Sequence, residues 1–283
     1  MRAGYTAAMP STHDALVRRP FEGIPAERDL VAMRQLIPAA TVAARTTAEH
    51  GSVPVTIATV LPMTWPAVRR SDGSVTIGLQ ANVPGGDLSR AFGQAIVQAL
   101  AAEPGTPIER VDLTDGSPRL QDVLDLTGEF PLTLHETFEF WIDPESDRTP
   151  EVEAALAQAN EAIVPTAAIE GLPHAFWVDA GPKEHLRWVL DADEDRVIDA
   201  VARLHARRAS GVGEGTKYVG SFRAEGLTVP VWDLPSGFGA EGVEKEAADL
   251  EKRFTEALET TEPLTALERR ARGGIVARQV TLR

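Results

Sequence analysis

The sequence contains no cysteine, and this absence removes several kinds of chemistry at once. Disulfide scaffolds, cysteine-ligated zinc, iron–sulfur clusters and thiol nucleophiles all require that side chain. No apolar run approaches the roughly 18 residues of a membrane-spanning helix, and the first residues hold no signal-peptide core. We therefore expect a cytoplasmic protein without disulfides or membrane spans.

Positive charge is also in short supply, since 28 basic residues face 42 acidic ones and the formal net charge is −14. Residues 103–195 hold 22 acidic side chains and five basic ones. Polyanion binding needs a concentrated positive field, so most of this surface disfavours nucleic acid. Only the end of the chain reverses the sign, with arginines at Arg269, Arg270, Arg272, Arg278 and Arg283.

This Arg-rich tail leaves two interpretations open. It is either a site of ribosome or nucleic-acid association, or a solvated helix end and tail that pair with the protein's own acidic face.

The chain is 43% hydrophobic and 25% charged, a mixture typical of a protein with a buried core. Predicted elements follow the order strand, strand, helix, strand, strand, helix, and the order occurs twice. We predict an α+β fold of two tandem halves with mainly antiparallel sheets. The predicted parts are an N-terminal arm and short helix at 1–48, a first half at 49–165, a second half at 166–260, and a basic C-terminal helix and tail at 261–283.

Local patterns locate the elements of the first half. Strands rich in β-branched residues at 53–61 and 74–80 flank the turn signal Ser71-Asp72-Gly73, and we predict that they form a hairpin. Asp87 is a predicted N-cap for a helix at 88–102. Further predicted elements are strands at 108–113 and 132–142 and helices at 120–126 and 151–163.

The second half shows the same alternation of patterns. Asp193 precedes an amphipathic pattern, which predicts a helix. The predicted elements are strands at 175–180, 186–190, 218–223 and 227–232, and helices at 193–208 and 243–258.

No cofactor or metal motif is complete. Gly211–Lys217 resembles a phosphate-binding loop, but it leads from a helix into a strand, and Tyr218 stands where Ser or Thr is required. Asp191 and Asp193 precede a helix, where capping is a better explanation than Mg²⁺ binding. The six histidines lack the short spacings of metal ligands. We therefore predict neither a cofactor nor a metal.

One apolar segment is a candidate surface for a partner. Pro230 cannot donate to a β-ladder, which predicts an edge strand or a bulge. Trp232 beside Asp233 could then anchor a protein partner, because large aromatic side chains dominate many interfaces. The competing interpretation, which the pattern favours, places Trp232 in the core.

A hydrolase is the alternative to a binding protein. Catalytic carboxylates and histidines can come from anywhere in a chain, so a missing motif does not exclude them. The residues predicted to form such a polar site are His174, Glu184, His185, Asp191 and Asp193.

Three stretches together resemble a known family. They are Arg19–Gly23 with Ile37–Thr41, Gly213–Thr216 through Val229–Pro235, and Arg278–Arg283. The resemblance is to uncharacterised proteins of high-GC Gram-positive bacteria that form a domain of unknown function. Some members carry the labels preprotein translocase or topoisomerase, which the residues here do not support, and membership implies no functional residues.

The predicted fold is also similar to secretion-chaperone-like domains, and fold alone does not establish function. Our leading hypothesis is a non-catalytic binding or chaperone-like module that captures a protein partner in a cleft between the halves or at an edge strand.

Overall fold

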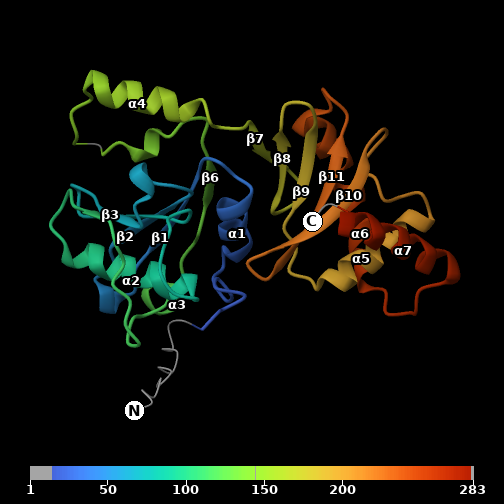
Figure 1. Cartoon of the computed structure of the whole chain (residues 1–283), viewed down its shortest axis with the longest axis horizontal. Helices are drawn as coiled ribbons and strands as arrows, with labels where there is room; N and C mark the ends of the chain where they lie inside the picture. Colours follow the sequence, from blue (N-terminus) through green and yellow to red (C-terminus); the bar gives the residue numbers. More distant parts are fainter. Residues whose placement is uncertain (1–14, 144, 282–283) are drawn as a thin grey trace, which may run out of the picture. The chain divides into compact units, whose positions relative to one another are not determined.

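The computed structural model describes residues 15–143 and 145–281, and these form two compact units (Figure 1). The first unit takes the chain up to Pro25, Thr41–Pro131 and Phe140–Asp147; the second takes Ala26–Ala40, Leu132–Glu139 and the residues from Arg148 onward. Helices accompany two mainly antiparallel sheets, which confirms the predicted α+β class. Within the described residues, no helix has the length and hydropathy needed to span a membrane.

The first sheet has the strand order β5-β3-β4-β2-β1-β6. Its strands are β1 (Ala40–Arg45), β2 (Pro54–Ala58), β3 (Ala67–Arg69), β4 (Val75–Gly78), β5 (Pro107–Ile108) and β6 (Leu132–Leu134). The helices between them are α2 (Leu88–Ala101) and α3 (Leu120–Val123). The predicted cap of α2 is confirmed, since the Asp87 side chain accepts hydrogen bonds from the backbone N–H groups of Ser89 and Arg90.

The predicted hairpin between 53–61 and 74–80 is wrong. Strands β2 and β4 pair in parallel, with Val55 opposite Val75, because the short strand β3 pairs antiparallel with β4. The turn signal itself is sound: Gly73 has φ +82°, and the Arg70 N–H donates to the Ser74 carbonyl at 2.8 Å. The turn therefore joins β3 to β4, and β3 was missed because three residues carry no detectable alternation.

The predicted strand at 132–142 is largely wrong as well. Only β6 is extended, and Glu139–Trp141 form a 3₁₀ turn. Side chains hold this turn, because the Arg70 guanidinium donates to the carbonyls of Phe140 and Trp141, and the Trp141 indole N–H donates to the Val60 carbonyl. These bonds to residues distant in the sequence take the place of a strand ladder.

Part of the predicted N-terminal arm packs on the first unit. Residues 1–14 lie outside the described part of the chain. Phe21 is fully buried, and the Pro20 carbonyl accepts hydrogen bonds from the side chains of Arg119 and Gln121. Residues 19–24 form turns, closed by the hydrogen bond from the Ile24 N–H to the Phe21 carbonyl, rather than an extended segment.

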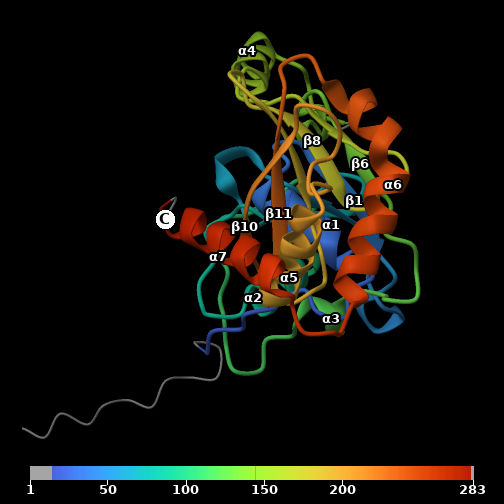
Figure 2. The same cartoon turned by 90° about the vertical axis from the view of Figure 1, so that its right-hand side faces the viewer.

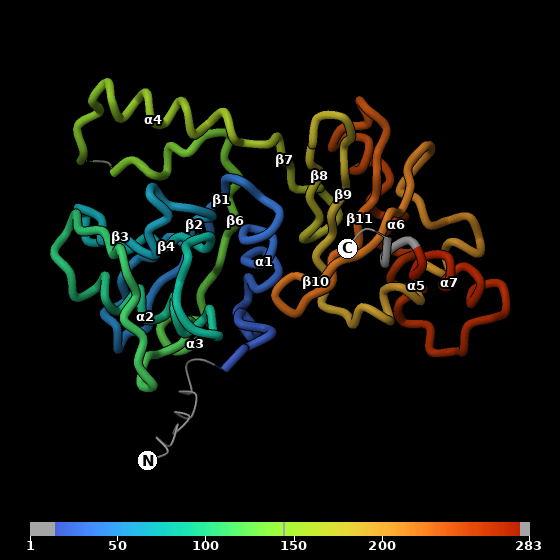
Figure 3. The backbone as a smooth tube through the Cα atoms, viewed as in Figure 1, coloured from blue at the N-terminus to red at the C-terminus, as the bar shows by residue number. Residues whose placement is uncertain are grey.

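Residues 175–260 of the second unit follow the predicted element order, whereas the short strand at Thr166–Ala168 was not predicted; Figure 3 traces the unit along the chain. Its sheet has the order β10-β11-β9-β8-β7, and every neighbouring pair is antiparallel. The strands are β7 (Thr166–Ala168), β8 (Ala175–Asp179), β9 (Glu184–Trp188), β10 (Lys217–Ala224) and β11 (Leu227–Leu234). The helices are α1 (Glu27–Gln35), α4 (Pro150–Asn160), α5 (Glu194–Ala206), α6 (Gly239–Glu259) and α7 (Ala266–Thr281).

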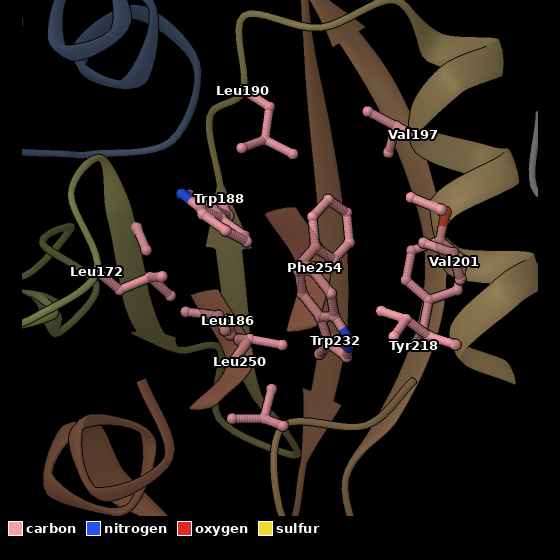
Figure 4. Close-up of a cluster of buried hydrophobic side chains, with 14 of the residues drawn as sticks. Leu172, Leu186, Trp188, Leu190, Val197, Val201, Tyr218, Trp232, Leu250 and Phe254 are labelled. Carbon is pink, nitrogen blue, oxygen red and sulfur yellow. The ribbon is translucent and has the colours of Figure 1, made fainter. Parts of the chain in front are cut away.

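Helices α5 and α6 contribute apolar side chains to a core on one face of this sheet, with α7 beside α5 (Figure 2). Aromatic rings fill its centre (Figure 4). Trp232 packs edge-on against Tyr218 and Phe254, with ring centroids 5.7 and 6.1 Å apart, and Trp188 lies 5.2 Å from Phe254. The core therefore fixes the positions of β10, β11 and α6.

Two polar contacts attach α1 to this unit. Asp29 Oδ1 lies 2.6 Å from His174 Nδ1, and the Arg34 side chain donates to Glu225 at 2.8 Å.

Candidate functional site

The edge-strand alternative for Pro230 is wrong, because β11 lies between β10 and β9, but a β-bulge between Tyr218 and Gly220 does lie next to its pair in the ladder with β10. The ladder from β11 to β9 ends at the pair of Val231 and Arg187, and it resumes only as an isolated bridge between Thr228 and Leu190. Pro230 falls in the gap between these pairs. A residue without an N–H group is tolerated there inside a sheet.

Trp232 is also unsuited to the role of a surface anchor. Its side chain is 1% exposed, and its indole N–H donates to the Ser210 carbonyl at 2.7 Å. The competing interpretation of a core tryptophan is confirmed. Asp233 faces the other side of the sheet, where it forms an ion pair with Lys183 and lies beside the His185 imidazole.

The polar residues predicted for a hydrolase do not meet at one place. His185 lies opposite Val178 in the ladder of β8 and β9, and His174 precedes Val178 by four residues. At about 3.3 Å per residue the two histidines are about 13 Å apart along the strand. Asp193 caps α5 by accepting the N–H of Asp195 at 2.9 Å, as its position before the helix predicts, and Asp191 is exposed in the same turn.

Glu184 has a structural role that explains its burial. Its carboxylate accepts hydrogen bonds from the Trp177 indole and the Gly239 backbone, both at 2.7 Å, and from the Gly237 backbone. Burial tends to raise the pKa of Glu184, but these hydrogen bonds outweigh it and leave the pKa below its usual value. The carboxylate therefore stays ionised and holds the segment that leads into α6.

His185 is held mainly in its neutral form. Burial lowers its pKa most; Asp233, with Nδ1 to Oδ1 at 3.2 Å, opposes this effect, and Arg187 and Lys183 add to it. In the described chain, no group of three or more histidine, aspartate or glutamate side chains could hold a metal ion. Neither a general-base pair with a nucleophile nor a metal centre emerges from these residues.

A different feature of the second unit has the shape and charge of a binding site. It is a cleft of about 850 Å³, which we call the basic cleft. The end of α5, the loop 207–216, the start of β10 and one side of α7 line it. Its lining residues are His205, Ala206, Arg208, Ser210, Gly211, Gly213, Thr216, Lys217, Tyr218, Leu267, Arg270, Ala271 and Gly274.

The loop in this cleft is held by side chains from the core. The guanidinium of Arg253, on α6, donates to the carbonyls of Ala209, Gly211 and Val212 at 3.2, 2.6 and 3.0 Å. The Trp232 bond to Ser210 fixes the same loop from β11. The loop is therefore ordered by the protein itself, which lowers the entropic cost of binding a ligand.

The glycine-rich run does not act as a phosphate-binding loop. The hydroxyl oxygen of Thr216 accepts the N–H groups of Val212 and Gly213 at 2.7 and 3.1 Å. Two amides that could cradle an anion are therefore occupied, which agrees with the rejection of that motif from its residue order. Glycine is instead needed for the loop to fold back closely on itself, since a Cβ on Gly211 would lie only 2.9 Å from the Thr216 hydroxyl oxygen.

The charge of the cleft comes from three side chains. Arg208, Lys217 and Arg270 line it, and none has an ion-pair partner within the described residues. No carboxylate belongs to the lining given above. Arg272, two positions from Arg270, shows the contrast: it pairs with Asp195 and Asp199 of α5, both at 2.6 Å.

The arginines of the Arg-rich tail differ in their contacts, so each of the two interpretations fits some of them. Arg272 pairs with the protein's own acidic helix, and Arg269 donates to the Leu264 carbonyl. Arg270 turns to the basic cleft. The side chain of Arg278 and the whole of Arg283 lie outside the described residues.

Arg208 has a backbone conformation that is unusual for its residue type. It follows α5 with φ +58°, a left-handed value at which glycine is favoured. Holding a non-glycine residue there costs about 1–2 kcal/mol. Such strain recurs where a side chain has a role, and here it accompanies a cation placed in the cleft.

The fold and the cleft define an α+β protein with a basic cleft in its second unit and no assembled catalytic group among the predicted site residues. A family model described as Family of unknown function (DUF5926) matches residues 20–283, so the chain belongs to that family. This confirms the resemblance to an uncharacterised family. No match was found among curated proteins, and none among solved structures.

Proposed function

We propose that this protein is a non-catalytic binding module and that its basic cleft receives an anionic ligand. One observation carries the proposal: three cations line a single cleft without a carboxylate among the lining residues. An acidic segment of a protein partner and a small phosphate compound share the chemistry that such a cleft recognises.

The charge balance of the chain makes this arrangement informative. With 42 acidic residues against 28 basic ones, exposed cations readily find an intramolecular partner, as Arg272 does. Three cations held near one another without partners repel each other. An anion relieves that repulsion and gains the attraction of all three, so its binding is favoured.

The hydrolase alternative receives less support. Its residues divide into Glu184 and His185 at one end of the β8–β9 hairpin and His174 at the other. Glu184 is engaged by three donors, and the pKa of His185 is lowered by burial. A chaperone-like role in which Trp232 contacts the partner also receives less support, because Trp232 is buried in the core.

Calorimetric titration with two probes tests this proposal. Inorganic tripolyphosphate and a hexaglutamate peptide carry the shared anionic chemistry at low salt. We expect at least one to bind the natural protein, and the variant with Arg208→Gln, Lys217→Gln and Arg270→Gln to lose that binding.

The matched control removes three cations that lie outside the cleft lining, with Arg110→Gln, Arg148→Gln and Arg223→Gln. It has the same net charge as the cleft variant, so a difference in probe affinity between the two variants shows that the position of the cations matters. Failure of both probes to bind the natural protein, or equal loss in the two variants, would refute the proposed function.

A further inference from the structure

We infer that the ligand of the basic cleft is a compact phosphate compound with two or more negative charges, and this inference rests on the proposed function. Three features of the second unit support it: the size of the cleft, the sign of the charge around it, and the types of cation within it.

The size of the cleft suits a small ligand. A volume of about 850 Å³ lies within the range of roughly 300–1,000 Å³ typical of small-molecule sites. A cube of that volume has an edge of about 9.5 Å. A hexaglutamate strand is about 20 Å long when extended, so only part of its charge would fall within such a space. A di- or triphosphate group places all of its charge there.

The charge outside the cleft opposes an extended polyanion. Glu214 and Glu268 adjoin lining residues in the sequence without lining the cleft themselves. Asp195 and Asp199 neutralise Arg272, the next arginine along α7. Repulsion from an exposed carboxylate such as that of Glu214 acts over about 10 Å at 0.1 M salt, which penalises the parts of a nucleic acid or acidic chain that extend past it.

The cations within the cleft suit a multiply charged phosphate group better than a single carboxylate. Arg208 and Arg270 each present a planar guanidinium that can donate two parallel hydrogen bonds to one phosphate group, and Lys217 adds a compact positive charge. A single carboxylate balances only one of the three. A phosphate chain with several charges balances all of them.

The walls allow such a group to approach closely. Five lining positions carry either no side chain or a single methyl group: Ala206, Gly211, Gly213, Ala271 and Gly274. The cleft offers little of the large aromatic surface that stacks nucleobases, since the Tyr218 ring is 6% exposed and the other ring of the lining is the small imidazole of His205. Recognition therefore rests on the phosphate part of the ligand rather than on an attached base.

The test compares probes of different length on the full chain. We expect inorganic tripolyphosphate to bind at least ten-fold more tightly than hexaglutamate and than a 20-nucleotide oligo-dT at 50 mM salt. Tighter or equal binding of either polymer would overturn this inference while leaving the proposed function intact. No binding by any probe would overturn both.

Two single variants keep the test specific. Arg270→Lys retains the charge but loses the guanidinium fork, and we expect a three- to ten-fold loss of tripolyphosphate affinity. Arg269→Lys is the matched control on the same helix and should change affinity less than two-fold. Equal affinities for the two variants would contradict recognition by the fork. Arg270 is exposed and has no ion pair within the described chain, so its replacement leaves the fold intact, as circular dichroism would verify.

Discussion

The guanidinium of Arg253 donates a 2.6 Å hydrogen bond to the carbonyl of Gly211, so the core helix α6 directly orders the loop of the basic cleft. Two further bonds from the same guanidinium reach Ala209 and Val212. Burial lowers the pKa of Arg253, and the guanidinium of an arginine remains charged in proteins. The cleft and the core are therefore connected through one side chain.

Replacement of Arg253 with glutamine should loosen this loop. We expect a loss of about 1–3 kcal/mol in the free energy of unfolding, because buried carbonyls lose a charged donor. Tripolyphosphate affinity should fall as well, since the loop no longer holds its bound shape. Urea unfolding and calorimetric titration measure the two effects. Lys252→Gln, at the exposed neighbouring position, should change neither; similar values for both variants would contradict the role of Arg253.

Replacement of Arg208 with glycine should separate stability from binding. Glycine accepts φ +58° without the steric cost of a side chain, so we expect the free energy of unfolding to rise by about 1 kcal/mol. Binding of tripolyphosphate should weaken at the same time, because one of the three cations is lost. A stability gain without a loss of affinity would show that Arg208 does not serve the cleft.

Replacement of Glu184 with glutamine should make the free energy of unfolding change less with pH in the acid range. The folded pKa of Glu184 is below its unfolded value, so its contribution is present above the unfolded pKa and is lost as pH falls through the folded pKa. We expect the variant to be less stable than the natural protein at pH 7 by about 1–3 kcal/mol. The difference should shrink below pH 4. Urea unfolding at pH 7 and below pH 4 measures this difference between the variant and the natural protein. A difference that does not change with pH would contradict the role of the ionised Glu184 carboxylate.

Replacement of Trp232 with alanine tests the placement of this residue in the core. We expect a loss of about 3–5 kcal/mol in unfolding free energy, the usual cost of removing a large buried aromatic side chain. Phe222→Ala, on the neighbouring strand, should cost far less, because Phe222 is 39% exposed. Thermal and urea unfolding compare the two. A surface anchor for a partner would show the opposite pattern, with little loss of stability at position 232.

The second unit was predicted well because its signals are local. Asp193 marks the start of α5, and alternating apolar residues mark the strands of this unit. The first unit was predicted less well, because the parallel pair of β2 and β4 depends on β3, a strand of three residues. Pairing across a short intervening strand leaves no periodic pattern in the sequence.

The sequence does not predict the basic cleft, because the lining comes from segments that are separate in the sequence. The glycine run by itself is comparable only with a phosphate-binding loop, and the Arg-rich tail by itself does not indicate which element it contacts. Arg208 and Arg270 are far apart in the sequence, and no motif predicts that α7 packs beside α5. One signal was available: Asp195 and Asp199 share a face of a predicted helix, as acidic partners for the arginines of the tail.

The central claim is that the unpaired cations of the cleft bind a compact phosphate compound, and one titration tests it most directly. Tripolyphosphate is titrated into the natural protein, into the Arg208→Gln, Lys217→Gln, Arg270→Gln variant, and into the Arg110→Gln, Arg148→Gln, Arg223→Gln control of equal charge. We predict that the natural protein and the control bind with affinities within three-fold of each other, while the cleft variant is at least thirty-fold weaker. Equal binding by the cleft variant and the control would contradict the account.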